Sequence, residues 1–207
     1  MNDNTAKKNN KIFIIRLALI LFLIVFISTL LLTLCNYLTK DKIAALEQKT
    51  ANEARQAVIP GAIFEEIKLS ESEEKEFSDE YDFKGAYRAE KDGKFSGYCI
   101  SVAPNGFGGE INMIVGLDEN LNYTGIKIIS LSETPGLGAK ASESEFTKQF
   151  SDNKKGKLEV IKNAKKTEEN QINAISGATI TSKAVTTGVN NALKIAEQIN
   201  NKEAEQN

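Results

Sequence analysis

The apolar and polar positions divide the chain into one long hydrophobic run near its start and a mixed remainder. The run LALILFLIVFISTLLLTL, residues 17–34, contains no charged side chain over 18 positions. As a helix it extends roughly 27 Å at about 1.5 Å per residue, and Cys35 and Tyr37 bring it close to the roughly 30 Å of a bilayer core. The pattern predicts a transmembrane helix over residues 17–38.

The charges on either side of this helix predict its orientation. Four basic residues and a single acid, Asp3, occupy residues 1–16, whereas Lys40 and Lys42 flank Asp41 just after the helix. Positive charge favours the cytoplasmic side of a membrane. We therefore expect a cytoplasmic N-terminus and an extracytoplasmic remainder.

Two processing events also use an N-terminal apolar run. A cleaved signal peptide has a shorter apolar core and an exit of small residues of the A-x-A type, which this sequence does not show. Lipoprotein processing would cut before Cys35, where Leu34 is large and such sites have a small residue. The pattern favours an uncleaved anchor over both.

Two polar segments follow the anchor. Residues 42–58 place apolar side chains near helical spacing and end before Pro60, which predicts a helix within a stalk of residues 39–59. Residues 70–82 are dominated by Glu, Ser and Asp, and this composition predicts a solvated loop.

Apolar stretches separated by turn residues then predict a meander of antiparallel strands. The Asp92-Gly93 pair is a strong hairpin signal, and a second turn is expected at residues 118–120. The expected strands are residues 86–89, 95–102, 111–115 and 123–131.

Helical signals return in the last third. Ser142 and Glu145 have capping-box spacing before residues 146–150, and residues 158–164 are ambiguous between strand and helix. Residues 182–199 predict a strongly amphipathic helix that packs on the sheet. Its apolar face carries Val185, Val189, Leu193 and Ala196. The fold class is therefore α+β, with one domain over residues 60–199 and a polar tail over residues 200–207.

Composition excludes several classes of function. The 26 basic residues against 28 acidic ones leave a net charge of −2, without the basic footprint of a nucleic-acid-binding protein. The chain has no histidine and two cysteines, which excludes Ser-His-Asp and Cys-His catalysis, a His-ligated metal and a four-thiolate site. We expect neither a nucleic-acid partner nor a metal.

Small and hydroxylated residues crowd into ISGATITS, residues 175–182, just before the amphipathic helix. Gly177 can adopt a positive φ, and the free amides and dipole of a helix start favour a phosphate. Ser176, Thr179 and Thr181 could each bond or covalently carry such a group. An ordinary loop with an N-cap has the same residue chemistry, so the two interpretations stay open at this point.

Three segments in the same order resemble the FMN-binding domain shared by the G subunit of the Rnf electron-transport complex and the C subunit of the sodium-translocating NADH:quinone oxidoreductase. They are GYCISVAPNGFGGEINMIVG at residues 97–116, SETPGLGAK at residues 132–140 and NAISGATITS at residues 173–182. In that family the threonine that closes the S-G-A-T run is esterified to the phosphate of FMN, which corresponds to Thr179. The short chain is more similar to the Rnf protein.

The resemblance implies a membrane-anchored flavoprotein that relays electrons within an ion-translocating ferredoxin:NAD oxidoreductase complex and has no catalytic activity of its own. It implies as partners the other membrane and peripheral subunits, a flavin transferase and membrane lipid. The residues implied around the FMN on Thr179 are Ser176, Gly177, Ala178 and Thr181. The alternatives are the quinone-reductase counterpart and an extracytoplasmic assembly module without flavin.

Two positions depart from the family pattern. Asn173 stands where the family often has an acid, and Ser132 stands where it often has a histidine. Neither changes the threonine that would bear the phosphate.

The turn at residues 133–138 presents an acid, a hydroxyl and an apolar side chain among glycines, on which a flat aromatic ring fits. Leu137 could pack on the ring face, Thr134 and backbone amides could bond its polar edge, and Glu133 could influence the charge of the reduced flavin. Gly136 and Gly138 leave room for this approach. An ordinary surface turn is the alternative.

The glycine run at residues 106–109 is not expected to bind phosphate. No G-K-S or G-K-T follows it, and the G-x-G-x-x-G order is absent. A bend or bulge is the better interpretation.

Overall fold

The computed structural model describes residues 3–151, 156–162 and 168–205. The chain divides into two compact units, Met1–Lys49 and Thr50–Asn207. Helix α1 (Asp3–Val58) contributes residues to both units, and each unit is described by itself.

The first unit consists of the greater part of α1, and its side chains from residue 13 onward are exposed. The helix is long and apolar enough to cross a membrane. Within the apolar run, the hydroxyls of Ser28, Thr29 and Thr33 donate to the carbonyl one turn earlier, at 2.8 to 2.9 Å. These bonds satisfy the polar groups inside the helix, as a lipid environment requires.

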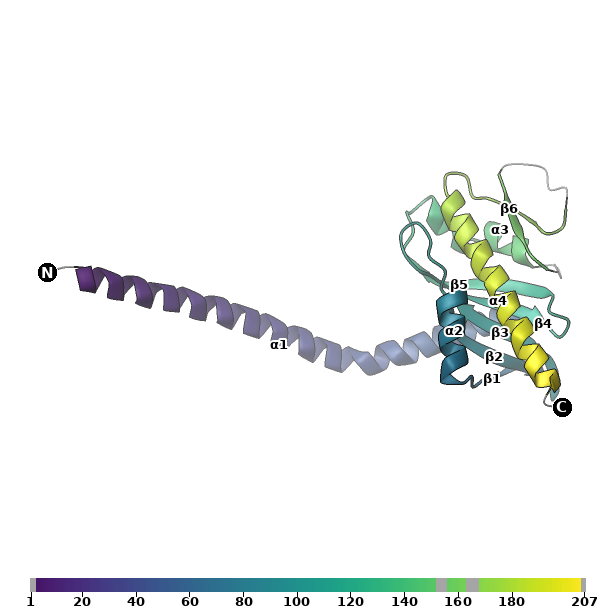
Figure 1. Ribbon diagram of the computed structural model, residues 1–207, viewed down its shortest axis with the longest axis horizontal. Coiled ribbons are helices and arrows are strands. Elements are labelled where there is room, and N and C mark those ends of the chain that lie inside the picture. The colour runs from purple at the N-terminus through teal and green to yellow at the C-terminus, as the bar shows by residue number, and fades with distance from the viewer. Residues whose placement is uncertain (1–2, 152–155, 163–167, 206–207) are drawn as a thin grey trace. The chain divides into compact units, whose positions relative to one another are not determined.

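The second unit is built on a five-stranded antiparallel meander in the order β1-β2-β3-β4-β5 (Figure 1). Its strands are β1 (Ile63–Glu66), β2 (Phe83–Lys91), β3 (Lys94–Val102), β4 (Ile111–Asp118) and β5 (Tyr123–Leu131). Asp92 and Gly93 have φ values of 53° and 73° in the β2–β3 turn, the positive values that the Asp-Gly hairpin signal predicts. The antiparallel sheet expected from the sequence is confirmed.

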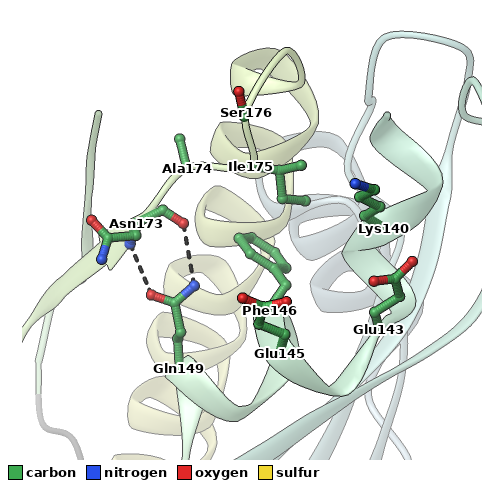
Figure 2. Close-up of a pocket in the computed structure, with 9 residues that line it drawn as sticks. All are labelled: Lys140, Glu143, Glu145, Phe146, Gln149, Asn173, Ala174, Ile175 and Ser176. Carbon is green, nitrogen blue, oxygen red and sulfur yellow. Dashed lines mark hydrogen bonds between the residues drawn. The ribbon is translucent and has the colours of Figure 1, made fainter. Parts of the chain in front are cut away.

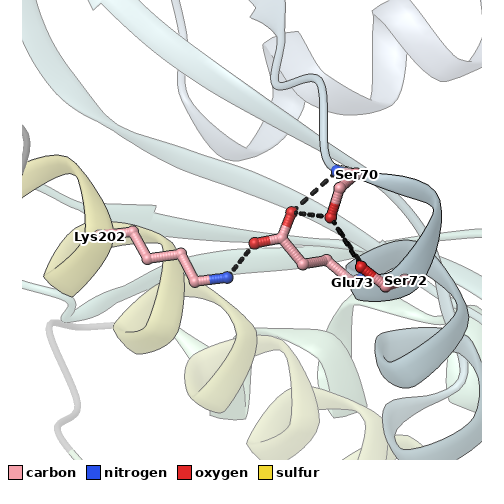
Figure 3. Close-up of polar contacts among 4 residues, drawn as sticks. All are labelled: Ser70, Ser72, Glu73 and Lys202. Carbon is pink, nitrogen blue, oxygen red and sulfur yellow. Dashed lines mark hydrogen bonds and ion pairs between the residues drawn. The ribbon is translucent and has the colours of Figure 1, made fainter.

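Residues 70–82 contain a helix and are not the solvated loop that their polarity predicted. Helix α2 (Glu71–Tyr81) begins after Ser70, whose hydroxyl accepts the Glu73 amide at 3.4 Å, while the Glu73 carboxylate accepts the Ser70 amide at 2.8 Å. This reciprocal pair is a capping box. Lys202 of the last helix forms an ion pair with the same carboxylate (Figure 3).

Two aromatic side chains hold α2 against the sheet. Phe77 and Tyr81 lie one turn apart and are both buried, and the Phe77 ring contacts that of Phe83 edge to face at 5.7 Å. The prediction of a loop was wrong because it rested on composition. The S-x-x-E spacing and a single pair of apolar residues four positions apart are sufficient to dock this short helix.

The segment after the sheet also differs from the prediction. The capping box expected at Ser142 and Glu145 does not form, because the Ser142 hydroxyl donates to the Ala139 carbonyl at 2.9 Å. Three short helices follow one another here, η1 (Gly138–Ser142), α3 (Ser144–Thr147) and η2 (Lys148–Phe150). Phe146 and Phe150 are buried and fix them to the core.

A small parallel pair of strands, β6 (Glu159–Ile161) and β7 (Gln171–Asn173), leads to the last helix. The segment expected to be ambiguous, residues 158–164, contributes residues 159–161 to β6, and residues 163 and 164 lie outside the described residues.

Helix α4 (Thr179–Glu205) crosses the sheet (Figure 1) and packs on the same face as α2. It begins three residues before the predicted start and continues through most of the expected polar tail. The four residues predicted for its apolar face, Val185, Val189, Leu193 and Ala196, are all buried. At Gly188 an added Cβ would lie 2.4 Å from the Met113 methyl, so this glycine allows the helix to approach β4 closely.

A second, smaller apolar cluster lies between the sheet and the end of α1. It consists of Ala54, Val58, Ile59, Ala62, Ala89, Cys99 and Ile114. The last turns of α1 are therefore part of the folded unit, in addition to any role as a spacer.

Candidate functional site

A cavity of about 410 Å³ lies between the turn after β5, the start of α4 and the loop between β3 and β4. It is lined by Phe107, Glu133, Thr134, Leu137, Gly138, Gly177, Ala178, Thr179, Ile180 and Thr181. This volume is within the roughly 300–1,000 Å³ range of small-ligand sites. The cavity brings together the two segments that the sequence singled out, which are about 40 positions apart.

The start of α4 provides one wall. Gly177 has a φ of 77°, which turns the chain from β7 into the helix, and the Ala178 amide donates to the Ile175 carbonyl at 3.0 Å. The Ser182 hydroxyl accepts the Ile175 amide at 2.9 Å and donates to the Ala178 carbonyl at 2.9 Å. These bonds fix the direction of the helix, whose first amides have no intrahelical acceptor and point out of its N-terminus.

The hydroxyls near this helix start have different environments. Thr181 is 1% exposed, and its hydroxyl donates to Glu133 at 2.8 Å. Thr179 is the first residue of α4, is half-buried and lines the cavity. No hydrogen bond of its side chain is found within the described residues, so its oxygen is available to a ligand.

The turn after β5 provides the second wall. The Leu137 and Ala139 amides both donate to the Thr134 carbonyl at 3.2 Å, and Gly136 has a φ of 76°. This arrangement leaves Leu137 44% exposed at the cavity.

Glu133 is 8% exposed and joins the walls. One carboxylate oxygen accepts the backbone amides of Phe107 at 2.7 Å and Gly108 at 3.1 Å, and the other accepts the Thr181 hydroxyl. The glycine run at residues 106–109 forms a bend, as the sequence indicated. A hydrogen bond from the Gly106 amide to the Gly109 carbonyl, at 2.8 Å, closes it.

The sequence reasoning missed two residues of the site. Phe107 is 69% exposed and Ile180 is 56% exposed, and both line the cavity together with Leu137. An aromatic side chain within a glycine run and an apolar side chain on the outer side of a helix start were the available signals. Together these three residues form an apolar rim around the cavity.

Two predicted site residues, Gly136 and Ser176, do not line this cavity. Ser176 lines a second cavity of about 240 Å³, between the segment that leads into α4 and the short helices after β5 (Figure 2). Gln149 bonds both backbone groups of Asn173 there, at 2.9 Å to its amide and 3.2 Å to its carbonyl. The Asn173 side-chain oxygen is buried with no hydrogen-bond partner among the described residues.

The first cavity has the chemistry that FMN needs. The helix start and the Thr179 hydroxyl suit the phosphate, and the apolar rim suits a flat ring system. The residues present therefore fit the cofactor.

Comparison with known proteins identifies the family. Residues 106–194 match the family model of the FMN-binding domain, and residues 1–58 match that of the RnfG N-terminal region. The chain is 36% identical to the G subunit of the Na(+)-translocating ferredoxin:NAD(+) oxidoreductase complex of Acetobacterium woodii, over 90% of this chain and 93% of the relative. The chain belongs to the RnfG family.

Further relatives agree with this family. The chain is 32% identical to the G subunit of the ion-translocating oxidoreductase complex of Haemophilus influenzae, over 82% of this chain and 84% of that protein. It is 41% identical to the G subunit of the proton-translocating ferredoxin:NAD(+) oxidoreductase complex of Clostridium ljungdahlii, over 54% of this chain and 59% of that protein. The resemblance seen in the sequence is confirmed.

The fold is shared with a solved structure, that of the C subunit of the Na(+)-translocating NADH-quinone reductase of Parabacteroides distasonis. The two superpose with a TM-score of 0.50 at 24% identity, over 63% of this chain and 70% of the other. All residues that line the first cavity lie inside the FMN-binding match. The FMN-binding domain of this RnfG family member thus contains a cavity of suitable size and chemistry.

Proposed function

We propose that this chain is the membrane-anchored, FMN-carrying electron-transfer subunit of an ion-translocating ferredoxin:NAD oxidoreductase complex. The observation that carries the proposal is the coincidence of the cavity with the FMN-binding match in a chain of the RnfG family. The exposed apolar helix supports attachment to a membrane.

The cofactor is held, in this proposal, by a phosphate ester on the Thr179 hydroxyl. The Thr181 and Ser182 hydroxyls are engaged inside the fold, and Ser176 lines the other cavity. Thr179 combines a cavity position, a hydroxyl without a hydrogen-bond partner among the described residues, and the positive end of the α4 dipole. The first-turn amides of α4 would balance the remaining phosphate charge.

In this proposal the protein itself positions the flavin ring and sets its environment. Phe107, Leu137 and Ile180 would contact the apolar ring and limit its access to water, and Thr134 would bond its polar edge. Bound FMN supplies one- and two-electron redox chemistry.

The membrane topology and partners complete the proposal. The basic residues before the apolar run support a cytoplasmic N-terminus with the FMN-binding domain on the other side. The relatives are subunits of larger complexes, which supports contact with the other subunits of such a complex. Maturation requires a flavin transferase, and α1 contacts membrane lipid.

Intact-mass measurement tests the linkage. Wild-type chain from a host with a flavin transferase is expected to carry the mass of one esterified FMN and to remain fluorescent after denaturation. Thr179→Val removes the hydroxyl at nearly constant volume and is expected to abolish both signals. Thr187→Val makes the same change at an exposed position further along α4 and is expected to retain them.

Denatured Thr179→Val chain that still carried the FMN mass would disprove the site. Co-purification with quinone-reductase subunits would instead disprove the assignment to a ferredoxin:NAD complex, without affecting the linkage.

A further inference from the structure

Glu133 connects three segments that are distant in the sequence. Its carboxylate accepts the Phe107 and Gly108 amides, 26 and 25 positions away, and the Thr181 hydroxyl, 48 positions away. No lysine or arginine in the described ranges forms an ion pair with it. The buried carboxylate is therefore held by hydrogen-bond donors from the two elements that carry Phe107 and Thr179.

Two neighbouring glycines leave the space that this carboxylate occupies. A Cβ added at Gly106 would lie 2.1 Å from one carboxylate oxygen, and one added at Gly138 would lie 2.4 Å from the other. Neither glycine has a positive φ, so close approach is the reason for the small residue. Both contacts are too short for any side chain to fit without displacing Glu133.

We infer that Glu133 is a positioning residue of the FMN site, whose carboxylate clamps the Phe107 loop to the first turn of α4 and so fixes two adjoining walls of the cavity. This inference rests on the proposed function and differs from a direct effect of the Glu133 charge on the flavin. Without the carboxylate, two amides and a hydroxyl lose their acceptor, and the Phe107 end of the loop loses the hydrogen bonds that link it through Glu133 to Thr181 of α4.

Hydrogen exchange on the full-length chain tests the clamp without any flavin. In chain from a host that lacks flavin transferase, Glu133→Ala is expected to raise the exchange rate of the Phe107 and Gly108 amides by about tenfold or more. Glu133→Gln should keep most of the protection, because its side-chain oxygen still accepts both amides and its NH₂ can donate to Thr181. Glu143→Ala, which removes an exposed acid outside the cavity, is the control.

A second route to the same result guards against a variant that fails to fold. Gly106→Ala should displace the loop from the carboxylate and raise the same exchange rates. Gly85→Ala should not, because its added Cβ would make an ordinary contact at 3.6 Å with the Tyr87 ring. Wild-type exchange at Phe107 and Gly108 in folded Glu133→Ala or Gly106→Ala would overturn the inference.

Measurements on the flavin-loaded chain separate a positioning role of Glu133 from a direct effect of its charge on the flavin. If Glu133 positions the walls, Glu133→Gln keeps the flavin absorption spectrum and reduction potential close to wild type, while Glu133→Ala changes both. Equal shifts of the potential in the two variants, with unchanged exchange at the loop, would overturn the inference in favour of a charge effect. Wild-type chain that never carries FMN would disprove the proposed function and leave the apo-chain exchange result standing.

Discussion

Glycine meets two different physical needs around the cavity. At Gly177, the φ of 77° is a backbone conformation that favours glycine, and it directs the chain into α4. At Gly138 the backbone is ordinary, but a Cβ would overlap the Glu133 carboxylate. A sequence shows both simply as glycine, so only the structure separates a turn from a close approach.

The thiol of Cys99 provides a test of the second apolar cluster. Burial raises its pKa from the ordinary 9.0 to about 12, although nearby Arg55 acts in the opposite direction. A raised thiol pKa means that the native state keeps its proton while the unfolded state loses it. The free energy of unfolding should therefore fall by about 1.4 kcal/mol per pH unit as pH rises above 9 toward 12, in addition to the contributions of other groups.

Denaturant unfolding of wild type and Cys99→Ala at pH 8 and at pH 10 measures this effect. The variant is expected to be less stable at pH 8, because it leaves a small cavity, and to lose less stability between the two pH values. Equal losses in the two proteins would contradict a buried, protonated thiol. Native Cys99 should also resist alkylation at pH 8 until the chain is unfolded.

The short helix α2 shows how few residues determine whether a helix forms and where it packs. Its capping box joins Ser70 and Glu73, and the hydrogen bond from Lys202, followed by those from Ser70, lowers the pKa of Glu73 to about 2. One end of the helix is thus tied to the last turns of α4. The other end is fixed by the buried Tyr81.

Ser70→Ala is expected to lower the free energy of unfolding by about 1 kcal/mol, because the Glu73 amide loses its acceptor at the helix start. Ser72→Ala lies inside the same helix and, within the described part of the chain, removes a hydrogen bond to the Ser70 hydroxyl alone, so it should change the free energy of unfolding by less than about 0.5 kcal/mol. Thermal or denaturant unfolding compares the two. An equal, small effect of both variants would show that α2 is held by its aromatic residues alone.

Strands were easier to predict than these short helices. Apolar stretches and the Asp92-Gly93 turn predicted the four strands from β2 to β5, because a meander pairs neighbours in the sequence. The polar composition around α2 and the capping spacing at Ser142 were misleading, since a helix of one to three turns depends on what it packs against. The sequence left residues 158–164, which contain β6, ambiguous between strand and helix, and it did not predict the parallel pairing with β7.

The whole molecule combines an apolar helix with a folded unit that starts at Thr50. Ala54, Val58 and Ile59 belong to the second apolar cluster, on the face of the sheet opposite α4. The boundary between the anchor and the domain therefore lies before these residues, within α1, and not at Pro60, which follows the end of α1 at Val58.

A chain that begins at Lys42 is expected to be soluble and monomeric without detergent, because it lacks the apolar run and keeps the cluster. A chain that begins at Pro60 is expected to aggregate or to unfold at a lower temperature, because Cys99 and Ile114 lose their cover. Size-exclusion chromatography and thermal unfolding compare the two. Equal stability of the shorter chain would contradict a structural role for the end of α1.

By itself, the sequence determined the apolar anchor, the antiparallel meander, the amphipathic last helix and the S-G-A-T segment around Thr179. Each of these depends on periodicity or on residues adjacent in the chain. Only the tertiary structure decided that Phe107 and Ile180 border the cavity, that Ser176 lies outside it and that Glu133 links its walls. The physical reason is distance along the chain, because hydrogen bonds that join residues 25 to 48 positions apart leave no pattern in either partner's neighbourhood.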